Sequence, residues 1–351
     1  MKDLYIIMPG KQLPSRLLSM VSAFSKHSPK ITEVASSEDL ANFQNKKLLF
    51  VLNIGITGFD IDMLNFFQSL INTDKNSFSG STGTVLAYSE NEFGTKRCAQ
   101  DIIFLANSMG CAFIGHPLVE ATGSLRNFLT WKKTLDIPLE EICLEMCDRL
   151  GKRFMEYEYQ KLLNPKITVL YSSPHKYSNT LNLWRMVSEK LQDFNINELL
   201  IENGKILDCK GCSYKLCQHY AKKNTCFYGG FMVENVLPAI ESSDAVVWLC
   251  PNYNDSISSN LTATINRLTV LYHKQSFYSK CLFGVVVSGN SGSDSVAKQL
   301  IGALNINKGF RLPPRAILSE TANDPKAVLK VKNIEQKTMD YAKTFLDEFQ
   351  I

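Results

Sequence analysis

The chain has 351 residues, of which 45% are hydrophobic, and a formal net charge of +4 at pH 7. This length predicts two globular domains, and the mild charge, without a block of lysines or arginines, excludes nucleic acid and membrane surfaces as expected partners. No apolar run reaches the roughly 18 residues of a membrane helix, and the first ten residues resemble a strand and a turn more than a signal peptide. We therefore expect a cytoplasmic protein.

Strand and helix patterns alternate along the whole chain. In the first half, apolar runs predict strands at 3–8, 47–52, 83–88 and 111–115, and amphipathic spacing predicts helices at 13–26, 60–72, 95–109 and 138–163. In the second half, the same signals predict strands at 167–171, 197–201, 244–250, 283–288 and 312–318, and helices at 179–193, 231–241, 257–273, 293–305 and 333–349. This alternation predicts α/β architecture, with parallel sheets covered by helices on both faces.

The order of these elements also repeats. Leu48–Leu70 and Val246–Leu268 each run from a strand through a loop of small residues into a helix, and each half closes with a long helix. Pro165 ends the first of these long helices. We therefore expect two doubly wound domains in tandem, residues 1–164 and 165–351.

The stretch 167–180 is a candidate phosphate site. A β-branched strand stops at a small, polar turn, and a helical pattern carrying Leu181, Trp184 and Val187 begins directly afterwards. At a helix N-terminus, unpaired N–H groups and the positive end of the helix dipole favour an anion. The residues around this N-terminus are Ser172, Ser173, Ser178, Asn179 and Thr180. Such residues are also ordinary helix caps, so a cap without a ligand is the alternative.

Two further loops are expected beside it. In doubly wound sheets, ligands bind outside the carboxyl ends of the strands, at the point where the strand order reverses. Pro251–Ser259 and Ser288–Ser293 each follow a predicted strand of the second domain. We expect these loops to converge with Ser172–Thr180.

Together the three loops resemble the NADPH-dependent FMN reductase family of flavodoxin-like proteins. Ser172–Thr180 is similar to the family's Gly-Ser-Pro-Arg-x-x-Ser-Asn-Thr loop, and Asp244–Tyr253 to its strand ending in Pro-x-Tyr. Ser256–Leu268 resembles the following helix, with Asn-Arg-Leu in place of Asp-Arg-Leu, and Ser288–Gly292 resembles the third flavin loop. The resemblance covers residues 165–325, and it implies a flavodoxin-like fold.

The resemblance implies FMN as the cofactor and NAD(P)H as a transient electron donor. It places the phosphate on Ser173, Ser178, Asn179 and Thr180, in a loop that also holds Ser172 and His175. The residues expected to border the flavin ring are Pro251, Asn252, Tyr253 and Asn254 on one side and Ser288, Gly289, Asn290 and Gly292 on the other. His175 stands where the family has arginine, and a histidine carries little charge at neutral pH. No catalytic acid or base is expected, because flavin itself performs hydride and electron chemistry.

Ten cysteines without a secretion signal indicate a reducing compartment. Six of them lie in apolar or periodic segments and are expected to be buried: Cys98, Cys111, Cys143, Cys147, Cys250 and Cys281. The other four are clustered: Cys209, Cys212, Cys217 and Cys226. Four thiolates suffice for a 4Fe–4S cluster or a tetrahedral zinc, which the spacing does not separate, and a free or redox-active thiol loop is the alternative.

This cysteine segment resembles that of the iron–sulfur flavoproteins, in which a cluster would pass single electrons to flavin. Two features differ from that pattern. The cysteines of those proteins are more tightly spaced, and their Asp-Asp-Met is replaced here by Gly229–Met232.

The first half lacks the flavin motifs. Met8–Ser15 has no Ser-Asn-Thr, Asn53–Phe59 has no Pro-x-Tyr, and Ser89–Glu92 contains two acids, which are poor neighbours for a phosphate. We expect a degenerate flavodoxin-like domain without cofactor. Because family members commonly dimerise near the flavin, we expect either an intramolecular pseudo-dimer or a homodimer.

The sequence therefore predicts an FMN-dependent oxidoreductase. Electrons would come from NAD(P)H, or from a ferredoxin-like protein if a cluster forms, and would pass to a small acceptor such as a quinone, a free flavin or another protein. Without a Gly-x-Gly-x-x-Gly fingerprint, the nicotinamide is expected to stack transiently on the flavin. One alternative is a non-enzymatic binding module with structural zinc and vestigial pockets, and another is an enzyme that acts on a phosphate ligand without flavin.

Overall fold

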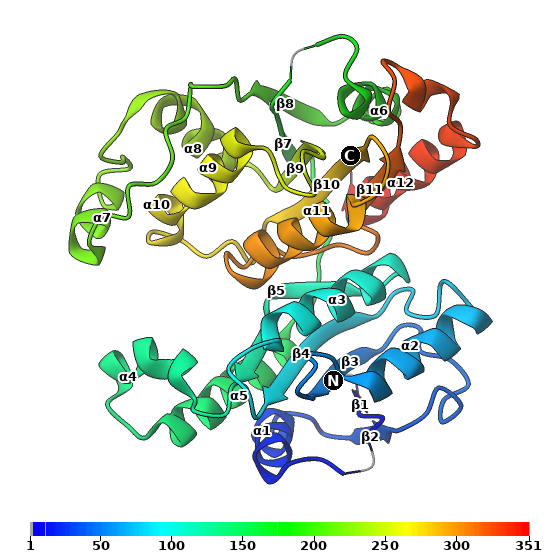
Figure 1. Cartoon of the computed structure of the whole chain (residues 1–351), viewed down its shortest axis with the longest axis vertical. Helices are drawn as coiled ribbons and strands as arrows, with labels where there is room; N and C mark the ends of the chain where they lie inside the picture. The colour runs from blue at the N-terminus through cyan, green and yellow to red at the C-terminus, as the bar shows by residue number, and fades with distance from the viewer. Residues whose placement is uncertain (1–2, 11, 174, 351) are drawn as a thin grey trace. The chain divides into compact units, whose positions relative to one another are not determined.

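The chain divides into two compact α/β units, Met1–Tyr159 and Gln160–Ile351. The computed structural model describes residues 3–10, 12–173 and 175–350. Each unit is built around one five-stranded sheet with helices on both of its faces (Figure 1). The boundary predicted from the sequence, between residues 164 and 165, falls shortly after this division.

The first unit contains a parallel sheet in the order β2-β1-β3-β4-β5. Its strands are β1 (Leu4–Ile7), β2 (Ile31–Val34), β3 (Lys47–Ile54), β4 (Thr82–Ser89) and β5 (Ala112–Ala121). Its helices are α1 (Ser15–Ser25), α2 (Ile61–Thr73), α3 (Thr95–Ser108), α4 (Leu129–Leu135) and α5 (Leu139–Glu156), with a 3₁₀ turn at Arg126–Phe128.

Two successive residues of β3 show how this sheet is covered. Leu49 belongs to the apolar cluster that α1 and α5 form on one face. The next residue, Phe50, stacks on Phe67 of α2 with 5.8 Å between the ring centroids. Because successive side chains of a strand point to opposite faces, α1 and α5 cover one side of the sheet and α2 the other.

The second unit contains a parallel sheet in the order β11-β10-β9-β7-β8. Its strands are β7 (Lys166–Tyr171), β8 (Asn195–Leu200), β9 (Ala245–Pro251), β10 (Cys281–Ser288) and β11 (Ile317–Thr321), and a short separate pair joins β6 (Leu162–Leu163) to β12 (Phe349–Gln350). Its helices are α6 (Asn179–Ser188), α7 (Tyr214–Ala221), α8 (Leu237–Ser242), α9 (Ser259–Arg267), α10 (Thr269–Tyr272), α11 (Ser293–Leu300) and α12 (Ile334–Glu348). Single turns of π-helix at Met232–Val236 and Ile301–Ile306 and a 3₁₀ turn at Ala327–Lys330 complete it.

Strand β10 shows the same two-sided covering in this unit. Phe283 stacks on Phe345 of α12, with 3.9 Å between the ring centroids. A side chain at Gly284 would instead come within 3.1 Å of Leu300 of α11. The two helices therefore pack on opposite faces, and α6 lies beside α12 (Figure 1).

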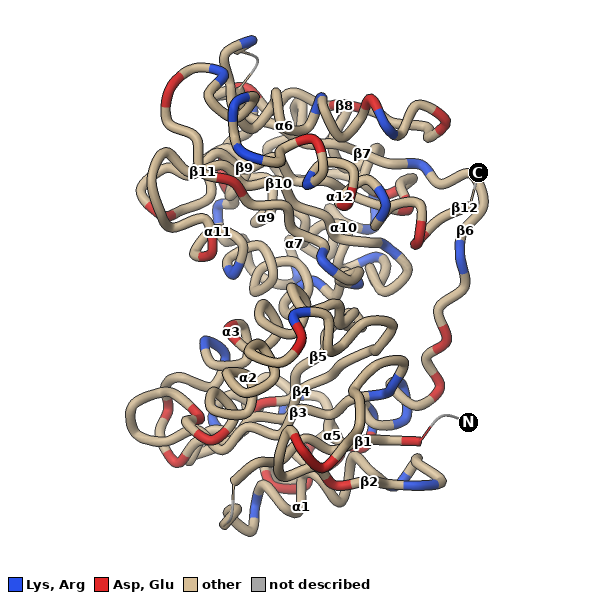
Figure 2. The backbone as a smooth tube through the Cα atoms, turned by 90° about the vertical axis from the view of Figure 1, so that its right-hand side faces the viewer, with Lys and Arg blue, Asp and Glu red and all other residues tan. Residues whose placement is uncertain are grey.

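Both sheets have the same topology. Numbered by position within each unit, the strands follow the order 2-1-3-4-5, which is that of flavodoxin. The predicted fold class, two doubly wound parallel-sheet α/β domains in tandem, is therefore confirmed. Lysines and arginines are interspersed with acidic residues over both units (Figure 2).

Several elements differ from the sequence-based expectation. The strand expected at 111–115 continues to Ala121 through Pro117, because His116 has a φ of 48° and the pairing register with β4 shifts there. Such a bulge accommodates a residue without an N–H group. The strand expected at 312–318 begins only at Ile317, and the long helix expected at 138–163 ends at Glu156.

Short or exposed elements account for most of what was missed. These are β2, α4 and α7, together with the two-residue strands β6 and β12. Each is too short for a periodic pattern to stand out. Within the described residues, no helix combines the length and the apolar character needed to cross a bilayer.

Candidate functional site

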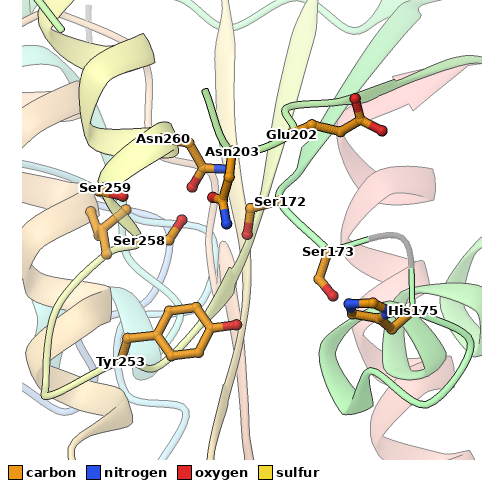
Figure 3. A pocket seen from close by; sticks show the side chains of 10 residues that line it. Ser172, Ser173, His175, Glu202, Asn203, Tyr253, Ser258, Ser259 and Asn260 are labelled. Atoms are coloured by element: carbon orange, nitrogen blue, oxygen red, sulfur yellow. The ribbon is translucent and has the colours of Figure 1, made fainter. Parts of the chain in front are cut away.

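A cavity of 530 Å³ lies at the carboxyl end of the second sheet (Figure 3). The loop after β7 contributes Ser172, Ser173 and His175, the loop after β8 contributes Glu202 and Asn203, and the segment after β9 contributes Tyr253 and Ile257–Asn260. Strands β7 and β9 are neighbours in the sheet. The strand that follows β7 along the chain, β8, lies on one side of this pair, and the strand that follows β9, β10, lies on the other side. The cavity therefore occupies the topological switch point, and its volume is in the range of small-molecule sites.

The loop after β7 is a tight turn that ends in a capped helix. The N–H of Ser178 donates to the carbonyl oxygen of His175 at 2.8 Å, and the Oγ of Ser178 accepts from the N–H of Leu181 at 3.3 Å. Ser173 and His175 lie next to each other on the cavity wall (Figure 3). Pro174, between them, lies outside the described residues. The predicted phosphate loop therefore faces the cavity with its first half, while Ser178 serves as a helix cap.

Asn179 and Thr180 are placed differently from the prediction. The Nδ2 of Asn179 donates to the carbonyl oxygens of Ala322 and Asp324, at 3.0 and 2.9 Å, and its Oδ1 accepts from the N–H of Val328 at 3.2 Å. Thr180 is buried. The amide of Asn179 thus joins the start of α6 to the segment after β11, and neither side chain lines the cavity.

Replacing Asn179 by alanine is expected to lower the free energy of unfolding of the second unit by about 2 kcal/mol, because partly buried backbone groups lose their partners. Urea denaturation of the full chain measures this change. Asn179→Asp retains only the acceptor and sets a charge beside two carbonyl oxygens, so it should be at least as destabilising. Unchanged stability in both variants would contradict this structural role.

The loop after β9 holds Tyr253 in a two-residue turn. The N–H of Tyr253 donates to the oxygen of Ser256 at 3.3 Å, and the N–H of Ser256 donates back at 3.1 Å. Asn254 and Asp255, between them, have φ values of 53° and 55°. Two left-handed residues in succession are typical of a type I′ turn, and asparagine and aspartate accept this conformation readily. The turn leaves Tyr253 54% exposed, with its ring at the cavity (Figure 3).

The loop after β10 is hydrogen-bonded to the loop after β9. The Nδ2 of Asn252 donates to the Oγ of Ser288 at 2.9 Å and to the carbonyl oxygen of Ser291 at 3.0 Å. A side chain at Gly292, where φ is 85°, would come within 1.8 Å of the Oδ1 of Asp255. Glycine is therefore needed for the two loops to approach each other.

The three predicted loops are therefore neighbours, but only two of them form the cavity wall. The oxygen of Ser288 accepts from the N–H of Ala322 at 2.9 Å, and Ala322 also accepts from Asn179, so the first and third loops are joined through the end of β11. Among the predicted ring-binding residues, Tyr253 lines the cavity. The others do not line it, namely Pro251, Asn252, Asn254, Ser288, Gly289, Asn290 and Gly292.

Two buried hydroxyl groups at this cavity have no hydrogen-bond partner within the described part of the chain. They are the Oγ atoms of Ser172 and Ser258, and both residues line the cavity. Ser258 precedes α9 but makes no side-chain cap. A buried hydroxyl without a partner costs about 1–3 kcal/mol, so native proteins rarely keep one without a reason. These atoms, facing a cavity of ligand size, fit a bound molecule with hydrogen-bonding groups.

The acidic residue at the cavity is neutralised by its neighbour. The carboxylate of Glu202 lies 2.6 Å from the ammonium group of Lys205. In Figure 3 this carboxylate points away from Ser173 and His175. The hydroxyl and imidazole side of the cavity therefore remains open to an anionic group.

Sequence reasoning missed Glu202, Asn203 and Asn260 as cavity residues. Glu202 and Asn203 follow the strand predicted at 197–201. Because parallel strands end at one edge of a sheet, that predicted strand was enough to place both residues near the site. Asn260 donates from its Nδ2 to the oxygen of Ile201 and thereby closes the wall between β8 and α9. No local pattern indicates this contact, because its partner lies far away in the sequence.

A second cavity, of 380 Å³, lies at the other end of α9 and is lined by all four clustered cysteines. Cys209 is exposed, whereas Cys212, Cys217 and Cys226 are half-buried. Among the residues that the structure describes, no group of three or more histidine, cysteine or acidic side chains is arranged to hold a metal ion. The thiols thus share a cavity without forming a coordination sphere.

Arg267 holds the cysteine segment together. This residue is buried, and its guanidinium group donates to the carbonyl oxygens of Leu207, at 3.4 Å, and Gly229, at 3.0 Å. These two residues lie before the first and after the last clustered cysteine. Arg267 therefore joins both ends of the segment to α9, which gives the Asn-Arg-Leu motif a structural role.

The remaining six cysteines are buried in the two sheets and helices, as predicted. Burial raises the pKa of Cys98 to about 12 and also raises those of Cys111, Cys250 and Cys281. These four thiols are both rarely ionised and shielded from solvent, so we expect them to be unreactive.

At the corresponding edge of the first unit, the loop after β4 carries the exposed acidic residues Glu90 and Glu92. The Oε1 of Glu92 accepts from the N–H of Ser124 at 2.9 Å, and hydrogen bonds to Ser124 hold the pKa of Glu92 below its usual value. A side chain at Gly123 would come within 2.1 Å of the carbonyl oxygen of Glu90. The loops after β4 and β5 are thus packed against each other, and the absence of a cofactor from this unit stays a prediction.

Comparison with known proteins identifies the family that the second unit resembles. Residues 165–324 match the model of the family named NADPH-dependent FMN reductase, which confirms the resemblance predicted from the three loops. No curated protein matches the chain significantly.

Solved structures of flavin-related proteins match about half of the chain. RosB, determined with the intermediate 8-demethyl-8-formylriboflavin-5'-phosphate, is 14% identical, with a TM-score of 0.40, over 52% of this chain and 79% of its own. The NAD(P)H:quinone oxidoreductase from Methanothermobacter marburgensis is 10% identical, with a TM-score of 0.37, over 53% and 95%. An azoreductase from Bacillus anthracis is 12% identical, with a TM-score of 0.35, over 52% and 99%. The fold assignment rests on the strand order, and the activities of these proteins are not transferred to this chain.

Proposed function

We propose that the second unit binds FMN in the 530 Å³ cavity and that the protein is an FMN-dependent oxidoreductase. One observation carries the proposal. Within the segment that matches the reductase family, a cavity at the switch point presents two buried hydroxyls, of Ser172 and Ser258, that have no partner among the described residues. A cofactor with a phosphate and a polar ring edge would supply those partners.

The residues of the cavity have separate tasks in this proposal. Ser173 and His175, beside the start of α6, would face the phosphate, where hydroxyl and imidazole groups donate hydrogen bonds and the helix dipole favours negative charge. Ser172 and Ser258 would donate to the polar groups of the cofactor. Tyr253, held by its type I′ turn, would cover one side of the ring and limit the access of water.

FMN, when bound, supplies the hydride and single-electron chemistry, so the protein needs no catalytic acid or base. NAD(P)H is the proposed electron donor and would approach the cofactor transiently. The proposed acceptor is a small molecule such as a quinone or a free flavin. A ferredoxin-like partner, a homodimer or pseudo-dimer, and a cytoplasmic location remain predictions.

Titration of the full-length protein with FMN tests the proposal. We expect a saturable change in flavin absorption and fluorescence, with one cofactor bound per chain, and reduction of the bound flavin by NADH or NADPH under anaerobic conditions. If the protein binds inorganic phosphate but neither FMN nor riboflavin, the flavin proposal is wrong and a phosphate-ligand enzyme is favoured.

An iron–sulfur or zinc centre at Cys209, Cys212, Cys217 and Cys226 remains a separate prediction. The four thiols line one cavity, which supports it, but the described side chains are not arranged around a metal ion. Metal analysis together with the anaerobic visible spectrum separates the possibilities. Iron with flavin favours electron transfer, whereas zinc without flavin favours the alternative of a non-enzymatic binding module.

Replacing Ser172 and Ser258 by alanine is expected to change stability and affinity in opposite directions. Removing a buried, unpartnered hydroxyl should stabilise the free protein by up to about 1 kcal/mol per site, while FMN affinity falls roughly tenfold because a hydrogen bond to the cofactor is lost. Thermal unfolding without cofactor and FMN titration measure the two effects.

Ser178→Ala is the matched control, because the Oγ of Ser178 caps α6. It should destabilise the free protein by about 1 kcal/mol. If Ser172→Ala and Ser258→Ala also destabilise the free protein, their hydroxyls have a structural partner and the argument from unpartnered groups fails.

A further inference from the structure

The cysteine cavity is a second chemical site, which the proposed flavin function does not use. Its four thiols come from three consecutive parts of the chain: the loop before α7, α7 itself and the loop after it. Arg267 brings the two ends of this segment together. Aromatic side chains complete the wall, namely Tyr214, Tyr220, Phe227 and Tyr228. The result is a partly apolar pocket with several thiols directed to one space.

The half-buried residue Lys308 reaches the wall of this cavity without being part of its lining. The Nζ of Lys308 donates to the Oγ1 of Thr269 at 2.8 Å, and Thr269 lines the cavity. Burial lowers the pKa of Lys308, and the nearby thiols of Cys209 and Cys217 act against that shift. A positive charge beside a thiol favours its ionised, nucleophilic form.

The surface around the cavity is also positive. The segment 205–226 contains five lysines and a single aspartate. Lys210, Lys215, Lys222 and Lys223 are exposed. Such a surface raises the local concentration of small anions and speeds their approach.

Two of the four thiols stand out. Cys209 is the exposed one, so it is the thiol that a molecule from solution reaches first. Cys217 is half-buried on α7, and it is the other thiol that lies close to the ammonium group of Lys308, which Thr269 holds at the cavity.

We propose that this cavity is a dithiol site that reduces anionic disulfides of low molecular weight, with Cys209 as the attacking thiol and Cys217 as the second thiol. The Cys209 thiolate attacks one sulfur of the disulfide, forms a mixed disulfide and releases one thiolate. The Cys217 thiolate then attacks the Cys209 sulfur, breaks the mixed disulfide and releases the second thiolate. Both released groups take up the protons that the two cysteines gave up, so one disulfide gains two electrons and the Cys209–Cys217 disulfide forms.

The site is tested with the full-length protein, reduced and treated with a chelator, and with oxidised glutathione as the probe. We expect two glutathione thiols released per chain, the loss of two hydrogen atoms from the protein, and a Cys209–Cys217 link in the peptide map. Cys217→Ser should stop at a glutathione adduct on Cys209, and Cys209→Ser should abolish the reaction. Cys212→Ser should leave it intact, and circular dichroism verifies that each variant is folded.

The effect of the positive surface is tested separately. Cystamine, a cationic disulfide, should react about tenfold more slowly than oxidised glutathione at low salt, and the difference should shrink as salt is added. Replacing Lys210 and Lys215 by glutamine should lower the rate with oxidised glutathione several-fold. Lys332→Gln, at an exposed lysine outside this segment, should leave the rate unchanged.

Three results would overturn the proposal. One is a Cys209–Cys212 product, another is reaction of all four thiols at equal rates, and the third is stoichiometric iron or zinc on these cysteines that the chelator does not remove. None of these measurements depends on flavin. Failure here and failure of the FMN titration are therefore distinguishable.

Discussion

Ser173→Asp is expected to weaken FMN binding about 100-fold. Ser173 lines the cavity beside His175, where the proposed phosphate would lie. A phosphate monoester carries nearly two negative charges at pH 7. A carboxylate a few Å away would cost about 3 kcal/mol at an effective dielectric constant between those of water and protein, which corresponds to this loss of affinity. Fluorescence titration of the full-length variant with FMN measures it.

Two controls separate charge from shape. Ser173→Asn introduces a side chain of almost the same size without the charge, so it should reduce FMN affinity only a few-fold. Riboflavin lacks the phosphate, so its affinity should be nearly the same in Ser173→Asp and Ser173→Asn. If the two variants weaken FMN binding equally, the effect is steric, and if neither changes it, the phosphate lies elsewhere.

The fold and the position of the site were predictable for one physical reason. Strands that alternate with helices form parallel sheets, and all the strands of a parallel sheet end at one edge. Loops that follow different strands are therefore brought together without any pattern of long-range contacts. This reasoning placed Ser172, Ser173, His175 and Tyr253 at a common cavity, where the structure has them.

The same reasoning failed where a side chain has a partner far away in the sequence. Asn179 was predicted as a phosphate ligand because it lies at a helix N-terminus within the family's loop, but its amide side chain binds three backbone groups between residues 322 and 328. Asn252 was expected at the flavin ring, yet its Nδ2 joins the loop after β9 to the loop after β10. A motif specifies which residue types occur at a strand end. It does not specify which of their side chains form hydrogen bonds with neighbouring loops and are therefore not free to bind a ligand.

The predicted end of β5 was wrong for a different reason. The strand predicted at 111–115 continues through Pro117 to Ala121, although proline removes a hydrogen-bond donor from a strand. The chain passes through a bulge at His116, and Arg153 donates to the carbonyl oxygens of Gly115 and His116. The compensating donor comes from α5, which follows later in the chain, so no local rule would have kept the strand intact.

Arg267→Met is expected to lower the free energy of unfolding of the second unit by about 3 kcal/mol. The buried guanidinium group pairs with the carbonyl oxygens of Leu207 and Gly229, and methionine fills the space without satisfying either. The loss should also release the two ends of the cysteine segment, so alkylation of Cys209 and Cys226 should become faster. Urea denaturation and timed alkylation with mass spectrometry measure the two effects.

Arg185→Met is the matched control. The Nη1 of Arg185 lies 2.8 Å from the Oε1 of Glu198, but the side chain is 49% exposed, so the loss should be at most about 1 kcal/mol without any effect on the cysteines. Arg267→Lys keeps the charge but cannot reach two carbonyl oxygens with a planar fork, so it should resemble Arg267→Met. Full rescue by lysine would mean that charge alone holds the segment. Unchanged alkylation in both variants would mean that the thiols are gathered by α7 and its aromatic neighbours rather than by Arg267.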